Sequence, residues 1–329
     1  MRGGARRHAL AIIAIVAALL AWTTHATASV GYQSSTIPVA EGKPIPVAIW
    51  YPTTATASDR NIGAFKQSVA TNAPVAGLRL PLVIVSHGTG GSKEGHSDTA
   101  WALANAGFVV AAIEHTADNY RDQSRATDVG NRPAELRRLI DFMLATSNQR
   151  ASLDPKRIGA FGHSSGGFSV LALAGGKPDL SRIAEHCSKQ PAAFECQMLG
   201  RQSATAAVQI AFVADARVKA LVVAAPALGY TLIGGLSAVR QQVQLWRADD
   251  DRLLPAPHYA DAVRASLPRK PDFRSVPMAG HFDFLAPCSD ILVKAAPMIC
   301  TSNAGFDRTA FHVGFNAEVV KFFRTRLGR

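Results

Sequence analysis

The sequence predicts an α/β protein built on a mostly parallel, doubly wound sheet that is preceded by an antiparallel hairpin. Short apolar runs bounded by glycine or proline alternate with amphipathic segments along most of the chain, which is typical of alternating strands and helices. The apolar runs are continuous, as expected of strands buried on both faces. Near the start, two apolar arms instead flank the turn-like residues 41–43 and predict the hairpin.

Strands are expected where a short apolar run stops at a turn signal. The run from Leu82 to Val85 lies between Pro81 and the glycine-rich residues 86–92. The other expected strands are residues 108–115, 157–162, 218–226, 243–247 and 272–277. Between the hairpin and the first of these strands, residues 53–76 are interpreted as a polar connection rich in alanine and threonine.

Helices are expected where apolar side chains recur every three or four residues. The clearest case is residues 131–147, which open near Pro133 and carry on one face Leu136, Leu139, Ile140, Met143 and Leu144. The charged side chains expected on the opposite face are Glu135, Arg137, Arg138 and Asp141. Further helices are expected at residues 96–107, 166–175 and 256–267, and near the C-terminus around Phe311, Phe315, Val319 and Phe322.

One domain is expected over residues 29–329, because the alternating pattern is interrupted only once. The interruption lies between Gly176 and Ala216 and carries two cysteines and a helical pattern at residues 205–215. We interpret this insertion as a small cap beside the functional site.

Residues 1–28 have the pattern of a secretory signal. Arg2, Arg6 and Arg7 precede an uncharged run over residues 9–22, and a small-residue cleavage site follows at residues 26–28. The run is shorter than the ~20 residues that a spanning helix needs. The sequence therefore predicts cleavage before Ser29, a secreted or periplasmic protein, and no membrane anchor after cleavage. Twin-arginine export is an alternative that the flanking residues fit less well.

The net charge and the cysteines indicate which binding partners and which cysteine chemistry to expect. The net charge of +11 falls to +8 without the three signal arginines, and the basic residues are scattered without the stripe and aromatic platforms of a nucleic-acid site. The four cysteines form two close pairs in a chain bound for an oxidising compartment. Three pairings of the four cysteines are possible, and we expect the local one, with the disulfides Cys187–Cys196 and Cys288–Cys300. No metal site is expected, because no histidine or acidic residue accompanies these pairs at ligand spacing.

A candidate nucleophile lies in residues 162–166, the only GxSxG in the chain. A serine on a tight turn between a strand and a helix projects above the sheet, and the flanking glycines permit the strained backbone. That context selects Ser164. The backbone N–H of Ser165 at the helix start would then face a developing oxyanion, which requires no particular side chain. The alternative is a glycine-rich helix start that holds nothing or a phosphate.

A serine hydroxyl needs a base, and on this kind of sheet the acid and the histidine follow the serine in that order. Residues 248–255, directly after an expected strand, offer three carboxylates. Asp251 is the predicted acid from its position in this loop, and Asp249 and Asp250 are the alternatives. His281, in the loop after the last expected strand, is the predicted base.

The second oxyanion donor should come from residues 86–92, the loop after the first buried strand. The backbone N–H of Thr89 is the predicted donor, and His87 could orient the loop through a hydrogen bond. The loop lacks the phosphate-binding patterns of nucleotide sites, so neither a nucleotide nor another cofactor is expected. His258 and His312 fall in expected helices and are interpreted as surface or core histidines.

Together these motifs resemble the α/β-hydrolase superfamily, and within it the secreted dienelactone-hydrolase-like and platelet-activating-factor-acetylhydrolase-like esterases. The resemblance covers most of the chain after the signal and rests on VIVSHGTGG, GHSSGG, RPAELRRLIDFML, ADDDRLLP and GHFDFLAPC, in that order. It implies an α/β-hydrolase fold, a triad of Ser164, Asp251 and His281, and oxyanion donors at Thr89 and Ser165. Dienelactone hydrolases themselves carry a cysteine nucleophile, so the resemblance does not extend to lactone ring opening.

The sequence thus predicts a serine hydrolase that cleaves small carboxylic esters, with short acyl groups, through an acyl-enzyme. One alternative is a non-catalytic binding protein on the same fold, since fold alone does not decide function. A second alternative is amide or peptide cleavage. No propeller domain or peptide-anchoring segment is recognisable, and an ester has the better leaving group.

Overall fold

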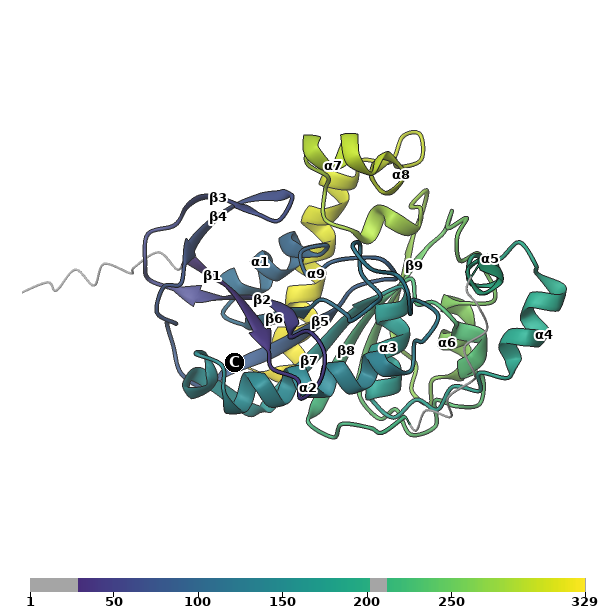
Figure 1. Ribbon diagram of the computed structural model, residues 1–329, viewed down its shortest axis with the longest axis horizontal. Helices are drawn as coiled ribbons and strands as arrows, with labels where there is room; N and C mark the ends of the chain where they lie inside the picture. The colour runs from purple at the N-terminus through teal and green to yellow at the C-terminus, as the bar shows by residue number, and fades with distance from the viewer. Residues whose placement is uncertain (1–28, 202–211, 329) are drawn as a thin grey trace, which may run out of the picture.

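The computed structural model describes residues 29–201 and 212–328, and these build one ten-stranded sheet with helices on both faces (Figure 1). Along the sheet the strand order is β10-β9-β8-β7-β5-β6-β2-β1-β4-β3. The bounds are β1 Ser29–Ile37, β2 Ile45–Thr53, β3 Ser58–Ile62, β4 Phe65–Thr71, β5 Leu80–Ser86, β6 Val109–Ile113, β7 Leu153–His163, β8 Val218–Ala224, β9 Gln242–Ala248 and β10 Asp272–Val276. Strands β5 to β10 pair in parallel, whereas β2 pairs antiparallel with β6 and β1. The predicted fold class is confirmed.

Helices α1 and α9 cover one face of the sheet, and α2 and α3 cover the other (Figure 1). The helices of the described residues are α1 Ser97–Asn105, α2 Asn131–Ala145, α3 Ser165–Leu173, α4 Arg182–Lys189, α5 Phe194–Arg201, α6 Ala260–Ser266, α7 Asp290–Ala295, α8 Pro297–Cys300 and α9 Arg308–Leu327. Short 3-10 turns are η1 Arg150–Ser152, η2 Gly229–Leu232 and η3 His281–Phe284.

Strand β5 shows why the central apolar runs are continuous. Leu82 and Ile84 pack into the core beneath α2 and α3, whereas Val83 and Val85 pack into the core beneath α1 and α9. Each residue therefore meets an apolar layer on whichever side it faces, and no polar alternation is possible.

The strand order of the sheet changes direction at β5. This strand has β6 on one side and β7 on the other, both parallel to it. In doubly wound sheets such a switch point leaves a crevice outside the carboxyl ends of the two diverging strands. Those ends are Ser86 and His163, so the loops that follow them face the same crevice.

Three expectations differ from the structure. Residues 53–76 are not a plain connection, because β3 and β4 form a hairpin that extends the sheet beside β1. The hairpin lies at the sheet edge and its outer strand is mostly exposed, which explains its polar sequence. Glu135 is buried and accepts a hydrogen bond from the His115 ring (2.6 Å), rather than facing solvent. His258 lies in the turn before α6 and not within that helix.

The insertion after α3 contains α4 and α5, which the disulfide Cys187–Cys196 joins. The helical pattern predicted at residues 205–215 falls largely on residues 202–211, outside the described residues. The predicted signal over residues 1–28 also falls outside them. No helix of the described parts is long and apolar enough to cross a membrane.

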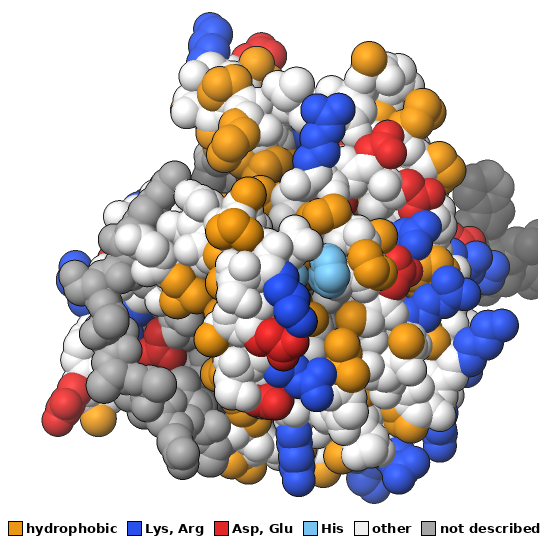
Figure 2. Space-filling view, turned by 90° about the vertical axis from the view of Figure 1, so that its right-hand side faces the viewer, with side chains coloured by type: hydrophobic (Ala, Val, Ile, Leu, Met, Phe, Trp, Pro, Cys, Tyr) orange, Lys and Arg blue, Asp and Glu red, His pale blue; other side chains and the backbone are white. Residues whose placement is uncertain are grey.

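Charge on the face that carries α4 to α6 is mixed rather than gathered (Figure 2). Lysine and arginine side chains lie spread over this face, among acidic and apolar ones.

Candidate active site

Ser164 occupies the tight turn between β7 and α3 with a strained backbone. Its φ of 55° and ψ of −122° lie in a region that side-chain-bearing residues rarely adopt. A Cβ on Gly162 would lie 2.2 Å from the carbonyl oxygen of Gly166, and a Cβ on Gly166 would lie 2.0 Å from that of Ser86. Both motif glycines are therefore required by the close approach of α3 to the strand ends, and that approach holds the turn.

Asp251 and His281 lie together in the loops after β9 and β10. The Nδ1 atom of His281 is 2.7 Å from Oδ2 of Asp251, and both side chains are buried. The other carboxylate oxygen accepts the backbone N–H groups of Leu253 (2.9 Å) and Leu254 (2.7 Å). Burial raises the pKa of Asp251, but the His281 ring and these hydrogen bonds outweigh it and hold the pKa below its usual value. The carboxylate is thus fixed and ionised beside the imidazole.

The two neighbouring carboxylates lie at the surface. Asp249 is exposed and binds Arg247 (3.0 Å) and Ser275 (2.5 Å). Asp250 is also exposed. Of the three candidates, Asp251 is the one whose side chain reaches His281.

His163, the residue before Ser164, contacts His281. The Nε2 atom of His163 is 3.1 Å from the carbonyl oxygen of His281, and the two imidazole ring centroids are 4.8 Å apart. Among the hydrogen bonds of the described residues, none joins the Ser164 hydroxyl to His281. Catalytic hydrogen bonds of this kind are often long without substrate and tighten when it binds.

The loop after β5 approaches the serine closely. A Cβ on Gly88 would lie 3.0 Å from the Cβ of Ser164. Next to it, the hydroxyls of Thr89 and Ser165 are 2.6 Å apart, so the two predicted oxyanion residues are in contact. The Ser165 side chain therefore has a partner, which the sequence did not indicate.

The His87 ring stabilises this loop through two hydrogen bonds. Its Nε2 atom accepts the backbone N–H of His115 (3.1 Å), so Nδ1 carries the proton and donates to the carbonyl oxygen of Gly88 (2.6 Å).

His312 lies in α9 and binds Asp98 (2.6 Å), which makes it a core histidine as expected. In the described ranges no group of three or more His, Cys, Asp or Glu side chains could hold a metal ion.

A pocket with a cavity volume of about 50 Å³ opens at Ser164. Thr89, Thr127, Ser165 and Glu195 belong to its polar lining. Its apolar wall is formed by Ala126, Val129, Ile183, Phe194, Met198, Leu199, Ala227, Leu228 and Leu254. Four of these side chains come from the two helices of the insertion: Ile183 from α4, and Phe194, Met198 and Leu199 from α5. The sequence analysis did not single them out. Their only signal was apolar spacing in two short helices of the insertion.

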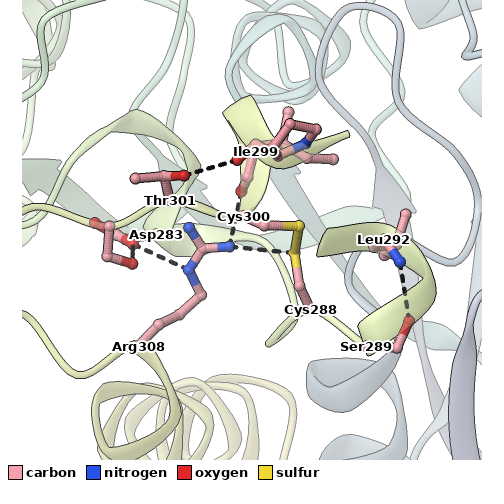
Figure 3. The surroundings of a disulfide bond; sticks show 10 residues. Asp283, Cys288, Ser289, Leu292, Ile299, Cys300, Thr301 and Arg308 are labelled. Atoms are coloured by element: carbon pink, nitrogen blue, oxygen red, sulfur yellow. Dashed lines mark hydrogen bonds and ion pairs between the residues drawn. A yellow bond between two sulfur atoms is a disulfide. The ribbon is translucent and has the colours of Figure 1, made fainter. Parts of the chain in front are cut away.

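The turn that carries His281 is anchored to the second disulfide, Cys288–Cys300 (Figure 3). Asp283 accepts the backbone N–H of Gly280 (2.7 Å) and pairs with Arg308 (3.0 Å), and it also contacts Ser302. Arg308 in turn donates to the carbonyl oxygen of Ile299 (2.8 Å) and lies 3.8 Å from the sulfur of Cys288. A continuous set of contacts therefore runs from the disulfide to the residue before His281.

Comparison with solved structures identifies the fold. A ferulic acid esterase from Streptomyces cinnamoneus superposes with a TM-score of 0.60 at 19% identity, over 93% of this chain and 92% of that one. The chain is therefore a protein of α/β-hydrolase fold, as predicted.

Sequence comparisons match proteins named as an esterase, cutinases and an acetylhydrolase over part of this chain. A family model described as platelet-activating factor acetylhydrolase, isoform II, matches residues 53–132. A cutinase of Thermobifida alba is 35% identical over 103 residues, which are 30% of this chain and 31% of the cutinase. The platelet-activating factor acetylhydrolase of Cavia porcellus is 25% identical over 153 residues, 33% of this chain and 35% of the relative. The chain thus matches about a third of the length of these relatives, and the matches support the predicted resemblance to α/β-hydrolase esterases.

Proposed function

We propose that this protein is a serine hydrolase that cleaves carboxylic esters through an acyl-enzyme intermediate on Ser164. The observation that carries the proposal is the buried Asp251–His281 pair, 2.7 Å apart, in the loops beside a strained serine turn. The names of the esterase, cutinase and acetylhydrolase relatives support the same reaction class.

In the proposed reaction, Nε2 of His281 takes the proton of Ser164 as the hydroxyl attacks the ester carbonyl. Asp251 binds Nδ1–H, which leaves Nε2 free to act as the base, and it stabilises the imidazolium that forms. The backbone N–H groups of Thr89 and Ser165 stabilise the oxyanion. The imidazolium then protonates the departing alcohol, and a water activated by the same histidine releases the acid.

The Asp251–His281 contact also favours a hydrolase over a binding protein on the same fold. A binding protein has no need of a buried, ionised carboxylate fixed against an imidazole. We favour ester cleavage over amide cleavage as the reaction. An alkoxide leaves more readily than an amide nitrogen, so it depends less on protonation by the imidazolium.

The pocket at Ser164 supports short acyl groups. Its volume of about 50 Å³ and its apolar wall suit a few carbon atoms. On a nitrophenyl ester series from acetate to palmitate, we expect kcat/KM to be highest at two to four acyl carbons and to fall by roughly tenfold or more with longer chains. Nitroanilides with the same acyl groups are the matched control and should resist cleavage. A maximum at long chains, or equal cleavage of the anilides, would contradict the assignment.

We also propose that residues 1–28 direct export and that the insertion between Gly176 and Ala216 forms a small cap beside the pocket. Two disulfides in the described chain support an oxidising destination, and α4 and α5 contribute pocket residues. The exported protein should begin at Ser29 by N-terminal sequencing. A variant without residues 2–28 should stay in the cytosol with reduced cysteines. Recovery of exported protein that still begins at Met1 would rule out cleavage.

The contacts around Cys288 and Cys300 predict a second role for their disulfide. In a Cys288→Ala, Cys300→Ala variant, loss of this 12-residue closure should lower the free energy of unfolding by about 3 kcal/mol. We also expect kcat to fall several-fold well below the melting temperature, because Arg308 loses its support beside Asp283. Ser289→Ala is the matched control. It removes the cap bond to Leu292 in the same excursion, keeps the disulfide, and should leave kcat unchanged. Unaltered kcat in the double variant would mean that the disulfide stabilises the fold but does not position the turn that carries His281.

A further inference from the structure

Arg132 is a buried cation directly behind the proposed oxyanion site, and the proposed mechanism does not use it. It lies in the first turn of α2 and is 2% exposed. Apolar side chains of the same helix, including Leu136 and Leu139, already fill the core beneath it. An arginine at such a position costs desolvation that an apolar residue would avoid, so packing alone does not account for it.

We propose that Arg132 is a positioning residue that locks the two oxyanion donors, Thr89 and Ser165, into one rigid arrangement. The proposal rests on the esterase function above. It assigns to Arg132 no contact with substrate, only control of the loop and helix that carry the two N–H groups.

The guanidinium fixes the Thr89 loop on both sides of Thr89. One terminal nitrogen donates to the carbonyl oxygen of His87, and the other pairs with the carboxylate of Asp118. Asp118 in turn accepts the backbone N–H of Gly90 (2.9 Å) with its second oxygen. His87, two residues before Thr89, and Gly90, directly after it, are therefore both tied to the Arg132 side chain, the first directly and the second through Asp118.

The third nitrogen of the guanidinium reaches the other donor. Its Nε donates to the hydroxyl of Ser169 (3.1 Å), and that hydroxyl donates to the carbonyl oxygen of Ser165 (2.6 Å). On the pocket side, the hydroxyls of Ser165 and Thr89 close the arrangement at 2.6 Å. The loop after β5 and the start of α3 are thus joined at the back by Arg132 and at the front by the two hydroxyls.

Only arginine offers this set of contacts. Its planar group presents donors in fixed directions, whereas a lysine ammonium is a single point that cannot face three acceptors so far apart. Oxyanion donors must be held within about 0.5 Å of the productive geometry. A loop that is free to shift relative to α3 would misplace one donor without emptying the pocket.

The test separates positioning from stability by using a trifluoromethyl ketone, which adds to the serine and places an oxyanion where the transition state has one. For Arg132→Lys we expect kcat on nitrophenyl acetate to fall by roughly tenfold to a hundredfold, with KM changed less than about threefold. The inhibition constant of the ketone should rise by a similar factor. If Arg132 had a purely structural role, Arg132→Lys would lower only the melting temperature. Both kcat and the inhibition constant of the ketone would then be unchanged well below that temperature.

Arg138→Lys is the matched control, because Arg138 is exposed on the same helix and should show no effect. Ser169→Ala removes only the link to α3 and serves if Arg132→Lys does not fold; its kcat and ketone affinity should fall together by several-fold. Unchanged kcat and ketone affinity in a folded variant, or equal losses in the Arg138 control, overturn the inference and leave the esterase proposal standing. A wild-type protein that cleaves no ester and does not bind the ketone overturns both.

Discussion

Replacing Ser164 with alanine should lower kcat on the best nitrophenyl ester by at least roughly a thousandfold, with little change in KM. Alanine removes the oxygen that forms the acyl-enzyme, whereas the pocket wall and the oxyanion N–H groups remain. Rate enhancement that survives would come from those groups alone. The fold should persist, because the substitution removes one oxygen that makes no hydrogen bond to another described side chain and leaves the glycine contacts of the turn intact.

The matched control for this variant is the adjacent serine. A fluorophosphonate should label wild-type protein and Ser165→Ala on the peptide that contains Ser164, and it should not label Ser164→Ala. Ser165→Ala keeps its backbone N–H and loses only the contact with Thr89, so a modest loss of kcat is expected there. A label on Ser165, or residual activity above about one part in a thousand in Ser164→Ala, would show that the nucleophile is misassigned.

The sequence was sufficient for the elements that carry the proposed triad, because parallel topology brings strand ends together. Ser164, Asp251 and His281 each follow a parallel strand, and the carboxyl ends of parallel strands lie at one edge of the sheet. The continuous apolar runs that become β5 to β9 were recognisable without knowing their neighbours. Because β9 and β10 are neighbours in the sheet, the loops that carry Asp251 and His281 lie side by side.

Contacts that depend on distant partners were not predictable from local pattern. Helical periodicity assigned Glu135 to the solvent face, but its partner His115 belongs to the loop after β6 and draws it into the interior. Arg132 and Asp118 were unremarkable in the sequence for the same reason, since their roles appear only when α2 packs beneath the Thr89 loop. The β3–β4 hairpin was missed because an exposed edge strand has no apolar alternation to detect.

The choice of Asp251 over its two acidic neighbours makes the sharpest prediction about the histidine. Asp251→Asn should lower kcat by about four orders of magnitude while the protein stays folded. The asparagine oxygen can still accept the N–H groups of Leu253 and Leu254, so the loop keeps its shape. Its amide nitrogen, however, would face Nδ1 of His281 as a donor. That contact places the imidazole proton on Nε2, the atom that must accept the proton of Ser164.

Asp249→Asn and Asp250→Asn are the controls, because they make the same change in the same loop. Both carboxylates are exposed, and neither contacts His281, so kcat should stay within a few-fold of wild type. Near-ultraviolet circular dichroism and the melting temperature of all three variants separate loss of the tautomer from loss of the fold. A crippled Asp249 or Asp250 variant beside an active Asp251→Asn would mean that the buried carboxylate serves the loop and that a neighbouring carboxylate orients the histidine.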